Sequence, residues 1–236
     1  MVASERDRRE DDQVRSVWLR PRRTSKGEPP LSRARIVEAA VALLDEEGIE
    51  RLTMRRLAER LGVVAPSLYW HVDTKDDVID LAVDAIFGEV PPGAGQAADW
   101  REDITAVMTA WRGALLRHPW AAAVPARRRP TIGPNFLGWM EVLQATLVRA
   151  GFTGKGLSAA TWALYNHVMG SAASESALHI TDAERRAGQE QLRARRDRYP
   201  TLAAGGYLYD DDWDGSFTTG LDYLLDGLAV QLGEKE

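Results

Sequence analysis

Apolar residues recur at helical spacing along most of this chain. The first stripe comprises Ile36, Ala39, Ala40, Leu43 and Leu44. These positions follow the i, i+3, i+4, i+7, i+8 pattern of one helical face. Ser32 suits the N-cap of this helix and Gly48 suits its end. Strand-like alternation is scarce elsewhere, so the pattern predicts an all-α fold.

Two short helices and a longer one follow. The inner face of the first short helix carries Leu57, Ala58 and Leu61. Gly62 breaks this helix, because glycine tolerates the positive φ of a tight turn. Pro66 fits the first turn of the next helix, over 66–71, since a first-turn amide needs no intrahelical partner. A sequence that resembles a capping box, 74–77, begins a longer helix over 75–88.

Proline and glycine then mark a boundary at residues 91–95, which read as a linker. Beyond it, helical periodicity returns over 100–117, 135–150, 158–178 and 216–232. The charged segment 182–196 permits a helix, and 203–215 reads as a mobile loop. The predicted organisation is a disordered arm over 1–30, a small helical domain over 31–90, and a larger helical domain over 91–236. The arm is either an Arg-containing contact to DNA phosphates or an unattached tail.

The composition excludes several kinds of functional site. The chain has no cysteine, which excludes disulfides and thiolate chemistry and fits a reducing cytoplasm. No two of the four histidines are four residues apart, so a helical zinc motif is absent. No membrane span or secretory signal is recognisable. We therefore expect a cytoplasmic protein with no metal and no cofactor.

Residues 53–71 have the form of a helix-turn-helix. Close crossing of two short helices needs a small residue, Ala58, and the turn needs Gly62. The second helix presents Tyr69, Trp70 and His71, and three consecutive residues cannot all face inward. On the recognition helix of such a motif these groups reach phosphates and base edges. The alternative is a plain helical hairpin whose aromatic residues pack internally.

Charge alone does not decide between these alternatives. The net charge of −5 argues weakly against a nucleic-acid partner. Within 51–60, however, four arginines (51, 55, 56 and 60) face only Glu59, which makes a small basic patch. Such a patch is either part of a DNA-binding surface or a solvated helix face. Arg55, early in the first helix, is placed to approach a guanine edge.

The run from Thr53 to Val63, followed by Pro66 to Val72 and Lys75, closely resembles the TetR (tetracycline repressor) family. The resemblance covers about residues 32–90. It implies operator contacts for Arg55, Pro66, Ser67, Tyr69, Trp70 and His71 and a phosphate contact for Lys75, and we include Thr53 among the DNA-binding candidates. Met54 and Ala65 replace polar residues that are usual in the tetracycline-repressor branch.

Family features continue past residue 100, in Leu116 to Trp120 and in Gly220 to Leu228. They imply an all-helical domain in which 158–178 and 216–232 form a four-helix bundle with a second subunit. A sensor pocket needs apolar walls and few polar groups. The candidates are Trp111, His118, Trp120, Phe136, Trp139, Met140, Trp162, Tyr165, Asn166 and Met169, with His167 as a further polar group. Each aromatic residue is alternatively part of the core.

The resemblance also bears on the effector. The tetracycline repressor binds a magnesium–drug chelate through a histidine shortly before an Arg-Pro step. Here Arg129-Pro130 is present, but Pro125 falls near the place of that histidine, so we expect no magnesium–tetracycline site. Arg127 to Arg129 either attract an anionic effector or form a solvated loop.

Together with this resemblance, the sequence predicts a homodimeric repressor that a small hydrophobic or aromatic effector releases from a palindromic operator. Residues 31–90 are then the DNA-binding domain, and 91–236 are the effector-binding and dimerisation domain. Two other functions are supported by fewer residues of the sequence. An enzyme would need a nucleophile motif, a phosphate loop or a metal cluster, and the sequence offers none of these. An architectural or activating DNA binder would not need so large a C-terminal domain, although activation and repression leave no distinct mark on the residues.

Overall fold

The computed structural model describes residues 31–89, 99–124, 132–178, 180–205 and 212–233. These ranges contain helices and no strand, which confirms the predicted all-α fold. The helices are α2 (Arg33–Glu47), η1 (Ile49–Arg51), α3 (Met54–Leu61), α4 (Ala65–Leu68), α5 (Lys75–Gly88), α6 (Trp100–Arg117), α7 (Pro119–Ala123), α8 (Pro134–Ala150), α9 (Gly154–Ala177), α10 (Asp182–Ala194), α11 (Pro200–Ala204) and α12 (Trp213–Gly233). None of these helices combines the length and apolar character needed to cross a membrane.

The chain packs as two compact units. Unit 1 comprises Met1–Gly95 and Gly113–Leu143, and unit 2 comprises Gln96–Arg112 and Gln144–Glu236. Helices α6 and α8 each have one end in unit 1 and the other in unit 2. The helical segment 113–117, together with α7 and the first part of α8, therefore packs with the N-terminal helices.

The predicted helix ends of unit 1 are confirmed. The hydroxyl of Ser32 accepts a hydrogen bond from the Arg35 amide, and Gly48 ends α2 at a φ of 76°. At the start of α5, Thr74 and Asp77 form a reciprocal capping box, in which each side chain accepts from the other residue's backbone amide. The shorter Asp thus does what Glu usually does in this motif.

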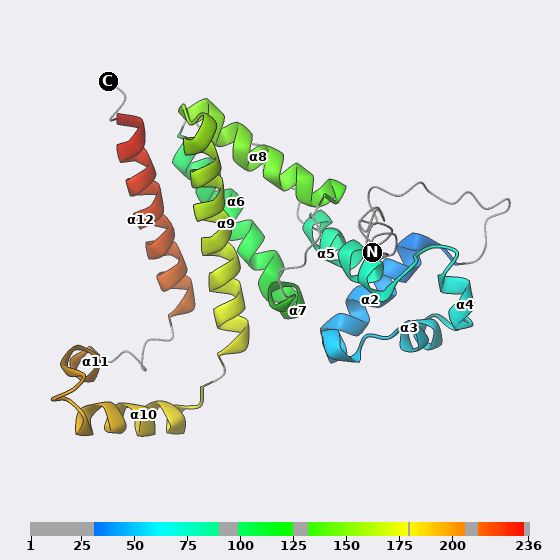
Figure 1. Cartoon of the computed structure of the whole chain (residues 1–236), viewed down its shortest axis with the longest axis horizontal. Coiled ribbons are helices and arrows are strands. Elements are labelled where there is room, and N and C mark those ends of the chain that lie inside the picture. Colours follow the sequence, from blue (N-terminus) through cyan, green and yellow to red (C-terminus); the bar gives the residue numbers. More distant parts are fainter. Residues whose placement is uncertain (1–30, 90–98, 125–131, 179, 206–211, 234–236) are drawn as a thin grey trace, which may run out of the picture. The chain divides into compact units, whose positions relative to one another are not determined.

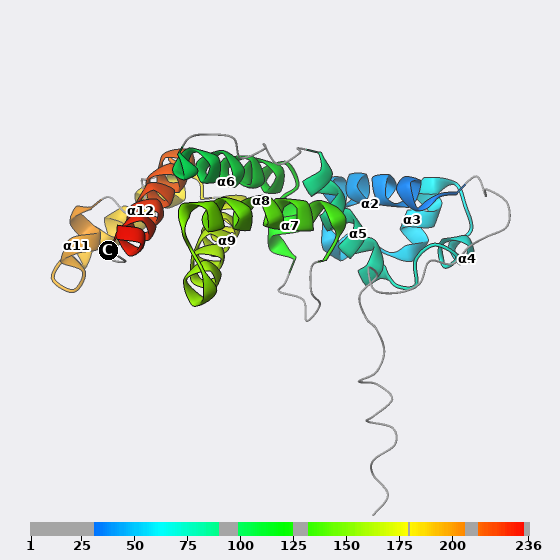
Figure 2. The ribbon, with the colours of Figure 1, turned by 90° about the horizontal axis from the view of Figure 1, so that it is seen from above.

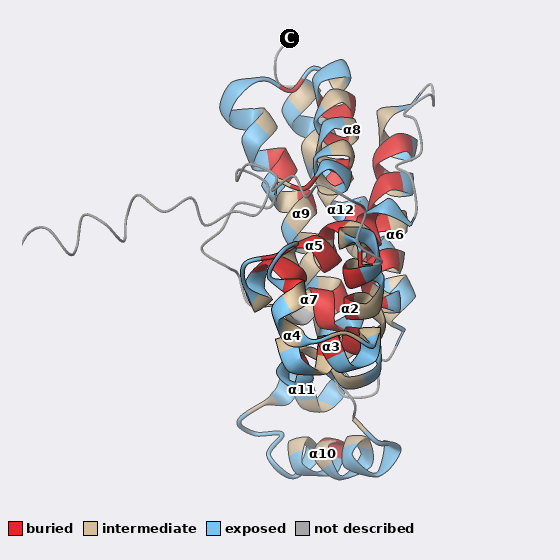
Figure 3. Cartoon of the chain, turned by 90° about the vertical axis from the view of Figure 1, so that its right-hand side faces the viewer, coloured by how far each residue is buried: buried red, intermediate tan, exposed pale blue. Residues whose placement is uncertain are grey.

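The core of unit 1 forms where α2 meets α3 and α5. Ile36, Ala40, Leu43 and Leu44 of the predicted stripe are buried, whereas Ala39 is half-buried. From α5, Val78, Leu81 and Ala82 are buried on the same side. Figure 2 shows α2, α3 and α4 grouped with α5, and Figure 3 shows the buried residues of this group in red.

In unit 2, helices α9 and α12 lie side by side (Figure 1). Leu164 and Val168 of α9 and Leu221 and Leu225 of α12 are buried. A glycine is needed at 220, because a Cβ there would lie 2.7 Å from the imidazole of His167. The backbone of α12 at Gly220 therefore lies close against His167 of α9.

Several predicted boundaries were wrong. Helix α4 ends at Leu68 rather than 71, although the His71 and Val72 amides still donate to the Leu68 carbonyl. The segment 203–215, predicted as a loop, contains the end of α11 and the start of α12. Helices α7 and α11 were not predicted. Both begin with a proline, which fits a first turn but also reads as a helix break in a sequence.

Candidate nucleic-acid interface and sensor residues

Helices α3 and α4 form the predicted helix-turn-helix. Thr53 caps α3 by accepting a hydrogen bond from the Arg56 amide at 3.2 Å. Gly62 ends α3 in the left-handed conformation, with a φ of 69°. The amide of Val63 then donates to the Ala58 carbonyl at 3.0 Å, and Ala58 itself is buried. The small residue and the glycine therefore hold the two places that the sequence assigned to them.

We define residues 66–71 as the recognition segment. Its residues differ sharply in how far they are buried. Leu68 is fully buried, whereas Tyr69 is 45% exposed and Trp70 is 72% exposed. Pro66 is exposed, and Ser67 and His71 are half-buried. A single leucine anchors this segment, and its two aromatic side chains face solvent rather than the core of unit 1.

The basic patch on α3 is largely paired with acidic side chains. Arg55 bonds Glu59 one turn ahead at 2.8 Å, with both side chains mostly exposed. This hydrogen bond raises the pKa of Arg55 above its ordinary value. Arg60 makes two contacts of 2.6 Å to Glu46, and Arg56 pairs with Glu47. Surface pairs of this kind are weak and are readily exchanged for phosphate contacts.

Two cations tie the recognition segment and α5 to neighbouring backbone. Arg33, in the first turn of α2, donates from Nη2 to the His71 carbonyl at 3.0 Å. Lys75 donates from Nζ to the Ile49 carbonyl at 3.2 Å. An ammonium has three donors, so this bond leaves Lys75 with donors for a phosphate. The structure therefore adds Arg33, which sequence analysis missed, as a residue that holds the end of the recognition segment.

The sensor candidates divide between the two units. Unit 1 holds His118, Trp120, Phe136, Trp139 and Met140, and unit 2 holds Trp111, Trp162, Tyr165, Asn166 and Met169. In unit 2, Tyr165 meets Trp111 edge-on at 5.5 Å and Trp162 at 5.3 Å. Trp111 is buried, Trp162 is 59% exposed, and Asn166 is exposed. This aromatic cluster thus extends from the interior of unit 2 to its surface.

His118 and Trp120 join a polar network in unit 1. The His118 Nδ1 lies 2.8 Å from Asp45, and Nε2 lies 3.1 Å from Glu89. Trp120 donates from Nε1 to the same Asp45 oxygen at 2.6 Å. The network joins α2, the end of α5 and α7. Both side chains are buried and hydrogen-bonded within this network.

The other unit 1 candidates pack against α5. Trp139 is fully buried and donates from Nε1 to the Phe87 carbonyl at 2.9 Å. Phe136 meets the Phe87 ring edge-on at 5.5 Å, and Met140 is half-buried. The remaining predictions on Pro125, Arg127 to Arg129 and the arm 1–30 lie outside the described residues.

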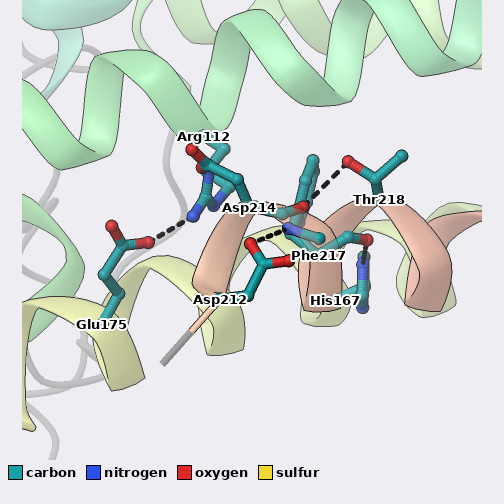
Figure 4. Close-up of polar contacts among 8 residues, drawn as sticks. Arg112, His167, Glu175, Asp212, Asp214, Phe217 and Thr218 are labelled. Atoms are coloured by element: carbon teal, nitrogen blue, oxygen red, sulfur yellow. Dashed lines mark hydrogen bonds and ion pairs between the residues drawn. The ribbon is translucent and has the colours of Figure 1, made fainter. Parts of the chain in front are cut away.

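An ion cluster around the buried Arg112 in unit 2 was missed from the sequence (Figure 4). Arg112 of α6 has a side chain only 8% exposed, and it pairs with Glu175 of α9 and with Asp214 of α12, the latter at 2.5 Å. Its guanidinium lies 4.9 Å from the centre of the Phe217 ring, on which His167 stacks at 5.0 Å. His167 also donates from Nε2 to the Phe217 carbonyl. The only signal was a charge within the apolar stripe of α6, four residues after Met108.

The fold and the α3–α4 pair define a helical protein with a helix-turn-helix unit. A family model described as "Tetracyclin repressor-like, C-terminal domain" matches residues 92–232. Another, described as "Bacterial regulatory proteins, tetR family", matches residues 36–82. The chain therefore belongs to the TetR family of transcriptional regulators, as the resemblance of 53–75 predicted.

Relatives support this assignment over nearly the whole chain. A helix-turn-helix-type transcriptional regulator of Saccharopolyspora erythraea is 46% identical over 220 residues, 92% of this chain and 93% of the relative. The transcriptional repressor DrrR1 of Streptomyces coeruleorubidus is 34% identical over 235 residues, 93% and 85% of the two chains. The crystal structure of ActR from Streptomyces coelicolor with actinorhodin matches with a TM-score of 0.77 at 28% identity, covering 89% of this chain and all of ActR.

Proposed function

We propose that this regulator is a homodimeric repressor that binds a palindromic operator and leaves it when a small aromatic effector binds. Residues 31–90 act as the DNA-binding domain and 91–236 as the effector-binding and dimerisation domain. The family models over 36–82 and 92–232 support this division. With no metal or cofactor in its mechanism, the protein works in the cytoplasm by binding alone.

The exposure of Tyr69 and Trp70 beside the buried Leu68 carries this proposal. Large aromatic side chains on a surface cost hydrophobic free energy, and clusters of them mark interaction sites. Here they directly follow α4, the second helix of the helix-turn-helix and the element that enters the major groove. Thr53, Arg55, Pro66, Ser67 and His71 contribute further contacts around them, and Lys75 contributes a phosphate contact.

Surface left exposed on α9 and α12 supports the proposed dimer. Tyr223 is 73% exposed, Val230 is 57% exposed, and the two share a face because they are seven residues apart. Trp162 on α9 is also exposed. Burying these side chains against the same helices of a second copy forms the four-helix bundle. Two recognition segments then read half-sites about 34–36 Å apart.

An aromatic effector is supported by the cluster of Trp111, Trp162 and Tyr165 in unit 2 and by the relatives. The ActR structure contains actinorhodin, and DrrR1 is named a repressor. The effector must bind the DNA-incompetent state more tightly, since equal affinity for both states shifts nothing. A coupling of about 1–3 kcal/mol is typical of such regulation. Helix α6 has residues in both units, and we assign to it the transmission of this change.

The experiment is selection of operator DNA from a random pool with the purified protein. We expect an enriched palindrome, and we expect the Tyr69→Ala variant to lose it while remaining dimeric. No enrichment at low salt would refute the repressor. With the operator in hand, a screen of planar aromatic compounds for release of the labelled DNA tests the effector.

A further inference from the structure

A groove of about 770 Å³ runs along α2 in unit 1. Its walls come from α2 and α5, and His118 and Asn135 complete the lining. The apolar part of the surface comprises Ala34, Val37, Val41, Ala42, Leu81 and Ala85. The volume falls in the range of roughly 300–1,000 Å³ that is usual for binding sites.

Acidic side chains surround this apolar surface. Glu38 and Asp45 line it from α2, and Asp84 and Glu89 line it from the α5 side. The basic groups of the lining are Arg33 and His118, and both are engaged, Arg33 with the His71 carbonyl and His118 with Asp45 and Glu89. Asp84 accepts hydrogen bonds from Asn135 and from the Phe136 amide, and Glu89 also pairs with Arg117. A carboxylate has about four lone-pair sites, so these groups can still accept from a further cation, and the four carboxylates outnumber the two basic groups. The groove therefore suits an occupant that combines apolar side chains with positive charge.

The chain contains a segment with this chemistry, residues 15–23, which lies outside the described residues. Its sequence, RSVWLRPRR, places Val17, Trp18 and Leu19 between arginines. It contains four arginines and no acidic residue. Trp18 supplies the largest apolar area of any residue type, and guanidinium groups pair well with carboxylates.

The covalent connection brings this segment to the groove. The described chain begins at the buried Leu31, and the groove lining starts two residues later, at Arg33. The groove follows α2 from Arg33 to Asp45, about 18 Å of helix, which an extended chain covers in about six residues. Residues 24–30 are long enough to reverse direction, and Gly27, Pro29 and Pro30 are typical of a turn.

We propose that residues 15–23 bind in the groove of the same chain, with 17–19 on the apolar walls and the arginines beside the carboxylates. The bound segment then contacts both α2 and α5, the two helices that support the helix-turn-helix. A short tether gives an effective concentration of about millimolar, so even a weak contact is populated. This proposal does not depend on the identity of the operator or the effector.

Disulfide crosslinking tests the proposal in the full chain, which has no native cysteine. The test variant carries Val17→Cys with Val41→Cys, inside the groove. The control carries Val17→Cys with Val64→Cys, which is in the same unit but 69% exposed outside the groove. Under mild oxidation we expect the test pair to crosslink about tenfold faster than the control pair. Equal rates would overturn the proposal, provided that thermal melts show both variants folded.

Two further measurements identify the occupant. Mixing chains that carry only Val17→Cys with chains that carry only Val41→Cys reports crosslinks between copies, and a product as abundant as in the double variant would overturn binding within one chain. Glu38→Lys, in the groove, should slow the crosslink of the test pair severalfold. Glu50→Lys, an exposed acid of η1 outside the groove, should not, and equal slowing would show general charge attraction instead of binding in the groove.

Discussion

Neighbouring residues of the recognition segment have opposite environments. Leu68 is buried in the core of unit 1, and the next two side chains face solvent. Arg33 holds the far end of the segment through the His71 carbonyl. Stability and the proposed DNA recognition therefore fall to different residues of this segment, so substitutions should separate the two properties.

Trp70→Ala should lower operator affinity by about tenfold or more, because one base-edge contact is worth ~1–3 kcal/mol. The stability of the protein should change by no more than about 0.5 kcal/mol, since the side chain is 72% exposed. Leu68→Ala is the matched contrast and should cost about 2–5 kcal/mol of stability. Fluorescence anisotropy and thermal melts measure the two effects. A large loss of stability in Trp70→Ala would show that the indole is structural.

Lys75→Met should weaken binding to every DNA sequence alike and reduce the log–log salt slope by about 0.9, the value for one phosphate contact. Lys155→Met is the control, because Lys155 is an exposed lysine of α9 in unit 2. The bond from Lys75 to the Ile49 carbonyl offers a competing role. If this structural bond is the main role of Lys75, the Lys75→Met variant should lose stability and its salt slope should equal that of the unmodified protein.

Arg112→Met should destabilise the protein by about 1.5–3 kcal/mol, because Glu175, whose side chain is 27% exposed, loses a charge-assisted hydrogen bond. Asp214→Asn should cost much less, since the Asp214 side chain is 87% exposed and water replaces the lost contact. Denaturant unfolding of the two variants gives the comparison. Equal costs would mean that Asp214, not Glu175, is the principal partner of Arg112.

At the scale of helices, the local sequence predicted where helices begin and end. It did not predict which distant residues contact one another. The Ser32, Thr53 and Thr74 caps and the Gly62 turn depend on residues within a few positions, and all were predictable. The Arg112 cluster joins residues 63 and 102 positions apart, which periodicity cannot relate. His118 and Trp120 illustrate the same limit, because their partner Asp45 lies on a helix more than 70 positions earlier.

Gly62→Ala tests the turn of the helix-turn-helix. A Cβ at Gly62 meets no atom within 4 Å, so the cost is that of the backbone alone, at a φ of 69°. We expect a loss of about 1–2 kcal/mol of stability and weaker operator binding. Gly138→Ala is the matched control, because Gly138 lies within α8 with equally open space and without a positive φ. It should stabilise the protein by up to about 1 kcal/mol. Thermal melts that show two equal changes would exclude the turn as the cause.

At the scale of the whole molecule, repression needs two recognition segments held at one spacing, so the proposed dimer is part of the DNA-binding activity. One face of α12 is buried through Phe217, Leu221 and Leu225. The exposed positions Tyr223 and Val230 lie on another face of the helix. A charge placed there should separate the subunits without unfolding them.

Val230→Arg should convert the dimer to a monomer, as measured by analytical ultracentrifugation. At a symmetric interface the two arginines, one from each subunit, would lie close together and repel each other. Val148→Arg is the matched control, since Val148 is 51% exposed on α8 and Val230 is 57% exposed. The monomer should bind the palindrome about 10²–10⁴-fold more weakly, because the second half-site no longer benefits from effective concentration. Its affinity for an isolated half-site should be unchanged. A Val230→Arg protein that remains dimeric with full operator affinity would place the subunit interface on another surface, and the exposed face of α12 would need a different partner.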